Sequence, residues 1–259
     1  MADFVLEIEY DGAPFAGWQR QAGPATVQGR LESALARLHA QARVTGAAGR
    51  TDSGVHAAGQ VALVSLERAI TPVRLMAALN HHLRPDPVAV LRAAPAPAGF
   101  HPRFSATERR YRYRILNRPA PPVLSRGHVW HVPGALDATL MREGAAHLVG
   151  RHDFTTFRAA ACQADSPLRT LDVITIETRA VPGGQELWLG FRARSFLHRQ
   201  VRSIVGTLAR VGAGLRAPGD VARALAARDR AACGPVAPAC GLCLTGVSFE
   251  NSPFREDAR

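Results

Sequence analysis

Apolar and polar residues alternate at the start of the chain, which is the pattern of a half-buried β-strand. The apolar positions are Phe4, Leu6, Ile8 and Tyr10, and the positions between them are Val5, Glu7 and Glu9. A helix is predicted next, because apolar residues then recur at helical spacing. They are Val27, Leu31, Leu35 and Leu38.

The same two patterns, alternation for strands and helical spacing for helices, predict the remaining elements. In the first part of the chain we expect strands at 43–47, 60–66 and 88–93 and a helix from Thr71 and Pro72 to about residue 83. After a Pro- and Ala-rich loop we expect a strand around 111–115, a helix near Asp137, strands at 171–178 and 186–192, a long helix at 196–211, a short helix near Val221 and a last strand at 242–249. The order β-α-β-β-α-β thus occurs twice. It predicts an α+β fold of two tandem ferredoxin-like units with mostly antiparallel sheets, divided into domains 1–100 and 101–259.

The strand around residue 111 carries two different faces. Tyr111, Tyr113 and Ile115 alternate with Arg110, Arg112 and Arg114. An arginine face of this kind can contact a polyanion, but solvated charge on one side of a strand is an equal alternative.

The charge of the chain is strongly positive. The net charge is +11, and all 32 basic residues are arginines. Without lysine, a P-loop and a Schiff-base mechanism are both excluded. A surface this basic suits a polyanion such as RNA, because guanidinium groups match phosphate oxygens.

Two further features narrow the class of protein. The chain has no secretory signal and no run of about 18 apolar residues, so we expect a cytoplasmic protein that does not enter a membrane. Cys240 and Cys243 form a CxxC, but only Cys233 lies near them in the sequence. A structural zinc site needs four ligands, so we expect reduced thiols and no metal.

The segment GRTDSGVHA, residues 49–57, is the strongest candidate for a functional site. It lies between two predicted strands, and functional residues concentrate on such loops. Arg50 would keep the carboxylate of Asp52 ionised, which suits a nucleophile or a general base. The alternative is a structural ion pair in a turn.

The long helix offers a second candidate. Its apolar stripe consists of Leu197, Val201, Ile204, Val205 and Leu208, and Arg199 and Arg210 fall on the opposite face. His198 and Arg202 lie on the flank of the stripe. An arginine that packs inward needs an anion, for which Asp52 is a candidate, unless Arg202 instead reaches solvent or phosphate.

The chain resembles the bacterial tRNA pseudouridine synthase A family. GRTDSGVHA matches the catalytic motif of that family. Further matches cover nearly the whole chain: EYDGAPFAGWQRQ, TVQGRLESAL, FHPRFSATERRYRYRI, HDFTTFR, RSFLHRQVRSIVGTL and GLCLTGVSF.

This resemblance implies an activity and a set of site residues. Family members convert uridine to pseudouridine at positions 38 to 40 of tRNA, in the anticodon arm, without a cofactor and as homodimers. By position, Asp52 is the nucleophile or base, Tyr111 stacks on the target base, and Arg202 pairs with the aspartate. Arg50 is expected to hold phosphate or the target nucleotide.

Several assignments stay open. Phe196 lines the pocket or only packs beside it. His56 belongs to the motif and either orders the loop, which we favour, or takes part in acid-base chemistry. Asp52 attacks the sugar, attacks the ring or abstracts a proton.

Two functions from other classes are alternatives to this one. Asp52-Ser53-Gly54 has the D[ST]G form of an aspartic peptidase, which needs two such aspartates; Asp165-Ser166 is followed by proline, so no second triplet occurs. A non-catalytic RNA-binding protein is the other alternative.

Overall fold

The protein consists of two compact units. Its structure, a computed structural model, describes residues 2–67 and 69–254. Unit 1 takes Met1–Arg109 and Cys243–Arg259, and unit 2 takes Arg110–Leu242. The last strand-like run, placed by the sequence in a second consecutive domain, therefore lies in the same unit as the N-terminal strands.

Unit 1 has the predicted order β-α-β-β-α-β, and the C-terminal strand is added to it. Its elements are β1 (Ala2–Tyr10), α1 (Val27–Leu38), β2 (Arg43–Ala47), β3 (His56–Leu66), α2 (Pro72–His82), β4 (Val88–Pro95) and β11 (Leu242–Phe249). β1 lies antiparallel between β3 and β4, with Leu6 opposite Ala62 and Ala93. The free edge of β3 pairs antiparallel with β2 and, nearer its start, parallel with β11.

Helix boundaries in unit 1 follow from capping chemistry. Thr26 accepts a hydrogen bond from Gly29 N, and Thr71 accepts one from Arg74 N before Pro72 at the first helical position. Each threonine satisfies an amide that the first turn leaves unpaired. Apolar side chains of both helices, among them Leu31 and Leu79, are buried.

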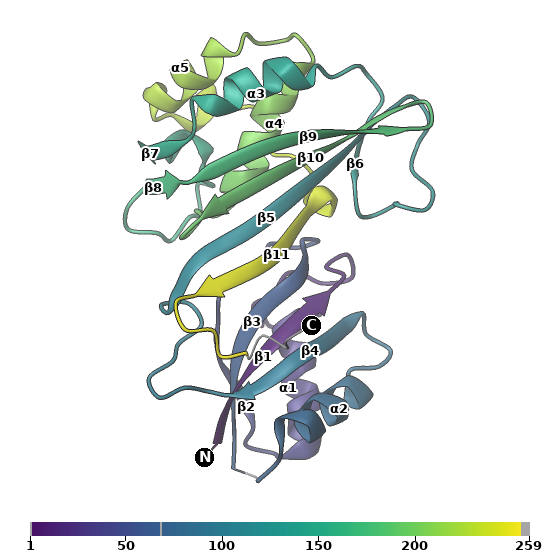
Figure 1. Ribbon diagram of the computed structural model, residues 1–259, viewed down its shortest axis with the longest axis vertical. Coiled ribbons are helices and arrows are strands. Elements are labelled where there is room, and N and C mark those ends of the chain that lie inside the picture. The colour runs from purple at the N-terminus through teal and green to yellow at the C-terminus, as the bar shows by residue number, and fades with distance from the viewer. Residues whose placement is uncertain (1, 68, 255–259) are drawn as a thin grey trace. The chain divides into compact units, whose positions relative to one another are not determined.

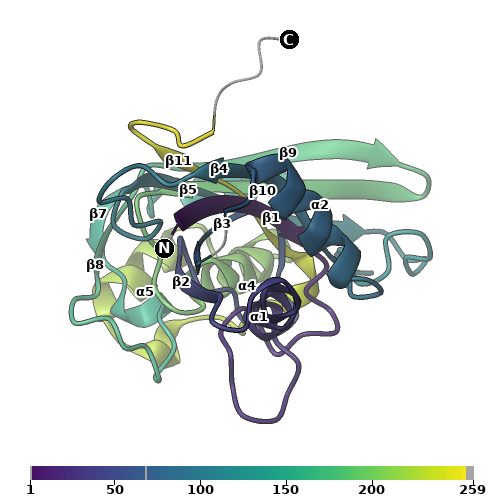
Figure 2. The same ribbon diagram turned by 90° about the horizontal axis from the view of Figure 1, so that it is seen from below.

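The other face of the unit 1 sheet is covered by the C-terminal segment. Val5, Val61 and Leu63 form a buried cluster with Phe254. Figure 2 shows the chain after β11 on the side of β1 and β4 opposite to α1. The two faces of this sheet thus carry separate apolar cores, which explains why β3 is buried along most of its length.

Unit 2 repeats the α+β pattern with additions. Its elements are β5 (Ala106–Asn117, which begins in unit 1), β6 (Trp130–Val132), α3 (Ala138–Ala146), β7 (Gly150–Asp153), η1 (Thr155–Phe157), β8 (Leu168–Leu171), β9 (Val173–Val181), β10 (Gly184–Ala193), α4 (Gln200–Gly212), α5 (Gly219–Ala227), η2 (Arg230–Ala232) and η3 (Ala239–Gly241). The sheet has the order β5-β10-β9, and α3, α4 and α5 gather on one side of it (Figure 1). The expected strand at 171–178 is divided at Asp172, and β6 and β7 were not predicted.

The long helix begins four residues later than its apolar stripe predicts. Arg199 adopts a left-handed conformation with φ of 60°, which a continuing α-helix does not allow. The buried side chain of Gln200 accepts a hydrogen bond from Leu197 N at 2.8 Å and so stabilises this turn. His198 is therefore outside α4, whereas Arg199 and Arg210 are exposed as predicted. Within residues 2–67 and 69–254, no helix has the length and apolarity needed to cross a membrane.

The arginine face of β5 is packed within unit 2. The Arg112 and Arg179 guanidinium groups lie 4.3 and 3.4 Å from the Trp188 ring centroid. Arg114 Nε donates to Glu186 Oε1, which also accepts from Trp188 Nε1. Arg112 and Arg114 therefore have a structural role on this sheet, and Arg110 is the one of the three that is exposed rather than half-buried.

The two sides of α2 provide a direct test of the unit 1 core. Leu79 is fully buried, whereas Val73 on the same helix is 70% exposed. Leu79→Ala should lower the free energy of unfolding by about 2–5 kcal/mol, because it leaves a cavity. Val73→Ala should change it by less than about 0.5 kcal/mol. Urea unfolding of both variants measures this, and equal losses would contradict the packing described.

Candidate active site

The candidate catalytic segment is the loop that joins β2 to β3. Ala48, Thr51 and Val55 are buried in this loop, whereas Asp52 is half-buried and Arg50 is exposed. The loop thus packs through its small and apolar residues and presents its two charged side chains outward. This is the placement expected of a carboxylate that meets a substrate.

Two buried polar side chains fix the start of this loop. Gln60, fully buried on β3, donates from Nε2 to Gly49 O at 2.8 Å. Arg109 donates to Ala48 O from both Nε, at 3.2 Å, and Nη2, at 2.7 Å. Ala48 N in turn donates to Val61 O at 2.8 Å. The backbone that leads into Asp52 is therefore hydrogen-bonded on both sides, which limits its movement.

The end of β1 and the segment after it, residues 10–18, hold the loop that carries Asp52 through hydrogen bonds. The hydroxyl groups of Tyr10 and Thr51 are 2.8 Å apart and both residues are buried. Trp18 N donates to Thr51 O at 3.1 Å, and Gly54 N donates to Phe15 O at 3.2 Å. The residues that flank Asp52 are thus held by backbone and buried side-chain hydrogen bonds.

Two glycines allow this close approach. A Cβ atom at Gly12 would lie 2.1 Å from Val55 O, and one at Gly17 would lie 2.6 Å from Thr51 O. Gly17 also has φ of 96°, a conformation that side-chain-bearing residues rarely adopt. Any larger residue at either position would push the segment away from the loop that carries Asp52.

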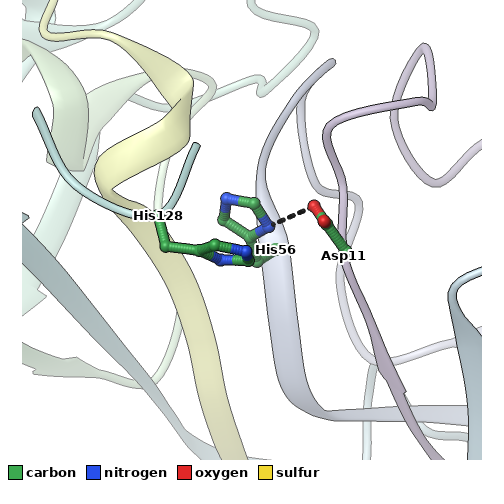
Figure 3. Close-up of side chains that lie close together, drawn as sticks. All are labelled: Asp11, His56 and His128. Carbon is green, nitrogen blue, oxygen red and sulfur yellow. Dashed lines mark ion pairs between the residues drawn. The ribbon is translucent and has the colours of Figure 1, made fainter. Parts of the chain in front are cut away.

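His56 connects the end of the loop to the same segment. Its Nδ1 lies 3.0 Å from Gly12 N and 3.0 Å from Asp11 Oδ1 (Figure 3). One ring nitrogen carries either a lone pair or a proton, so it accepts from Gly12 or donates to Asp11, but not both at once. His56 is buried, and in either state this nitrogen orders the loop.

Unit 2 contributes the aromatic candidates. Tyr111 on β5 and Phe196, which precedes α4, meet edge to face with ring centroids 5.1 Å apart. Both are half-buried. The structure thus brings together two of the residues predicted from sequence.

Arg202 lies in the first turn of α4. Its Nε donates to Ala237 O at 2.8 Å, and Ala237 N donates back to Arg202 O at 3.1 Å. The guanidinium group is also near Tyr113 and Cys240. Burial raises the pKa of the Tyr113 phenol and of the Cys240 thiol, and the Arg202 charge opposes both shifts.

Tyr113 and the CxxC cysteines are structural groups. Tyr113 is fully buried and its hydroxyl donates to Pro238 O at 2.7 Å. Neither Cys240 nor Cys243 is in a disulfide, and Cys240 Sγ donates to Val129 O. Since burial keeps the Tyr113 phenol and the Cys240 thiol protonated, neither suits a base or a nucleophile.

Several residues of this site were not identified from the sequence. They are Tyr10, Asp11, Gly12, Gly17, Gln60 and Arg109. Four of them lie in EYDGAPFAGWQRQ, a stretch that was matched to the family without a role for its residues. Gly12 and Gly17 follow Asp11 by one and six residues, and glycine is the residue type that permits such a close approach of two backbone segments.

The family model and the relatives that this chain matches are all named as tRNA pseudouridine synthases. The chain matches the family model described as tRNA pseudouridine synthase over residues 7–105 and 145–250. It is 61% identical over 254 residues to the tRNA pseudouridine synthase A of Cereibacter sphaeroides, covering 98% of this chain and 100% of that protein. It is 59% identical over 260 residues to the protein of the same name from Paracoccus denitrificans, covering 99% of each.

Substitution of two glycines tests whether the close contact of Gly17 with the loop that carries Asp52 is important. Gly17 and Gly23 both have φ of 96°, but only Gly17 has neighbours within 4 Å of an added Cβ. Gly17→Ala and Gly23→Ala should share a backbone cost of about 1–2 kcal/mol. Gly17→Ala should lower the free energy of unfolding further and speed amide hydrogen exchange at 51–55. Equal unfolding losses and unchanged exchange would show that the close approach is unimportant.

Proposed function

Because the chain belongs to the tRNA pseudouridine synthase family, we propose that it converts uridine to pseudouridine in the anticodon arm of tRNA, at positions 38 to 40. The observation that carries the proposal is the Asp52 carboxylate, half-buried on a loop whose backbone is fixed on both sides. Catalytic groups need such a rigid support.

The reaction needs no redox partner. The bond between N1 of uracil and C1′ of ribose breaks, the base turns, and C5 bonds to C1′. The hydrogen on C5 leaves as a proton, and N1 takes up a proton. Asp52 assists by attacking the sugar, attacking the ring or abstracting a proton, which are all steps open to an ionised carboxylate.

The other residues have supporting roles in this proposal. Tyr111 stacks on the target base, with Phe196 holding the tyrosine ring. Arg50, which is exposed, binds a phosphate near the target. Arg202 balances the charge of the Asp52 carboxylate, as the family resemblance implies, and His56 orders the loop. The target nucleotide must leave its stack to reach these groups, which costs a few kcal/mol that protein contacts offset.

The partner and setting follow from the same reasoning. A net charge of +11 favours tRNA binding. We propose, as the family resemblance implies, that the protein is a homodimer and needs no metal or organic cofactor. We also propose that it acts in the cytoplasm.

The activity can be measured with unmodified tRNA that carries tritium at uridine C5. Formation of the C5 to C1′ bond must expel this hydrogen, so the purified protein should release tritium into water in the presence of a chelator. Release should depend on uridine at positions 38 to 40. Salt-dependent tRNA binding without release would favour the RNA-binding alternative.

Asp52→Asn should reduce tritium release to background. The amide is isosteric but cannot act as nucleophile or base, whereas the phosphate contacts that dominate affinity persist, so the tRNA Kd should stay within about threefold. Asp172→Asn, at an exposed residue of unit 2, makes the same charge change and should retain activity. Normal turnover by Asp52→Asn would refute the assignment.

Variants of Tyr111 test the stacking role. Tyr111→Phe keeps the ring and should leave KM for tRNA within about twofold. Tyr111→Ala removes it and should raise KM by about 5- to 100-fold, the range for loss of base stacking on an aromatic ring. Steady-state tritium release gives both values, and an equal rise in KM for the two variants would exclude stacking.

A further inference from the structure

An exposed aromatic ring lies in unit 1 outside the groups assigned so far. Phe104, in the turn between β4 and β5, is 69% exposed. Its ring centroid is 4.6 Å from that of His101, and the Arg103 guanidinium lies 5.6 Å from the Phe104 centroid. We call His101, Arg103 and Phe104 the Phe104 platform.

The turn that carries the platform is tightly hydrogen-bonded. Phe104 N and Ser105 N both donate to His101 O, at 3.1 and 2.9 Å. His101 N donates to Ser105 Oγ at 3.2 Å, and Arg103 N donates to His101 Nδ1 at 3.2 Å. The exposed ring is therefore held in place before any partner arrives, which lowers the entropy cost of binding to it.

A buried arginine fixes this turn to the catalytic loop. Arg109 Nη2 donates to Arg103 O and to Ala48 O, both at 2.7 Å. Ala48 is the residue immediately before the GRTDSGVHA segment. On its inner side, His101 rests against Gly46 of β2, where an added Cβ would lie 3.2 Å from His101 Nε2. One guanidinium group thus sets the position of the platform relative to the start of the loop that carries Asp52.

We propose that the Phe104 platform stacks an unpaired base of the tRNA substrate, other than the target uridine. The inference rests on the proposed function, since it takes tRNA as the substrate. Every base offers a π-face to an aromatic ring, and an adjacent guanidinium adds attraction to the base or its phosphate. The net charge of +11 favours a polyanion over a basic or neutral protein surface.

Three substitutions at Phe104 separate stacking from apolar burial. Phe104→Ala should weaken binding of an unmodified tRNA transcript by about 5- to 100-fold. Phe104→Leu should bind this tRNA as weakly as Phe104→Ala, because leucine is apolar but has no π-face. Phe104→Trp should bind it with the affinity of the parent. At saturating tRNA, kcat should stay within about twofold, since the ring is outside the reacting groups. Val73→Ala, equally exposed on α2, is the matched control and should bind normally.

Salt dependence separates the ring from the charge. Arg103→Gln should reduce the slope of log K against log salt by about 1, the value for one phosphate contact. Phe104→Ala should leave this slope unchanged. Thermal unfolding of each variant should match the parent, because all three changed side chains are exposed.

Several outcomes would overturn the proposal. One is a tRNA Kd within twofold of the parent for both Phe104→Ala and Phe104→Leu. Another is normal binding by Phe104→Leu alone, which would indicate apolar cover instead of stacking. A third is a changed oligomeric state of Phe104→Ala in sedimentation, which would indicate a protein contact.

Binding and turnover also separate this proposal from the proposed function. If the parent binds tRNA but releases no tritium, the isomerase assignment fails. The tRNA Kd values of the Phe104 variants would still test the platform in that case. If the parent is active and Phe104→Ala binds normally, only the platform fails.

Discussion

The candidate site depends on backbone packing between the segment after β1 and the loop that carries Asp52. No side chain separates the two at Gly12 and Gly17, where an added Cβ would lie 2.1 and 2.6 Å from carbonyl oxygens of the loop. Backbone amides and the buried pair of Tyr10 and Thr51 can therefore hold the loop directly. The backbone that carries Asp52 is therefore held by contacts that do not involve the Asp52 side chain.

The arginine-only composition has different consequences in different places. Arg109 is buried and donates hydrogen bonds to Ala48 O, at the start of the loop that carries Asp52, and to Arg103 O. Arg112 is packed against Trp188 on the sheet of unit 2. Arg50 and Arg103 are exposed and suit phosphate. Guanidinium groups serve all three purposes because they combine a permanent charge, a flat face and several donors.

The sequence of this family member and its local structure can be related at particular residues. Identity of about 60% over the whole chain places the protein among tRNA pseudouridine synthases. The structure adds what sequence identity does not show, namely the hydrogen bonds and close contacts that hold each part of the loop that carries Asp52. Gln60 and Arg109 hold its start, Tyr10 and Gly17 support its middle, and His56 orders its end.

The sequence alone determined the order of the main strands and helices, since periodic apolar residues and capping threonines act locally. It was also enough to identify Asp52 as the candidate aspartate and to exclude a P-loop and a Schiff-base mechanism, since the chain has no lysine. Only the tertiary structure decided that β11 pairs with β3, that α4 starts at Gln200, and that Arg112 packs on Trp188. These features depend on residues far apart in the chain or on one left-handed residue, and periodicity carries no information about either. The role of Arg109 was hidden for the same reason, because its acceptor Ala48 lies 61 residues away.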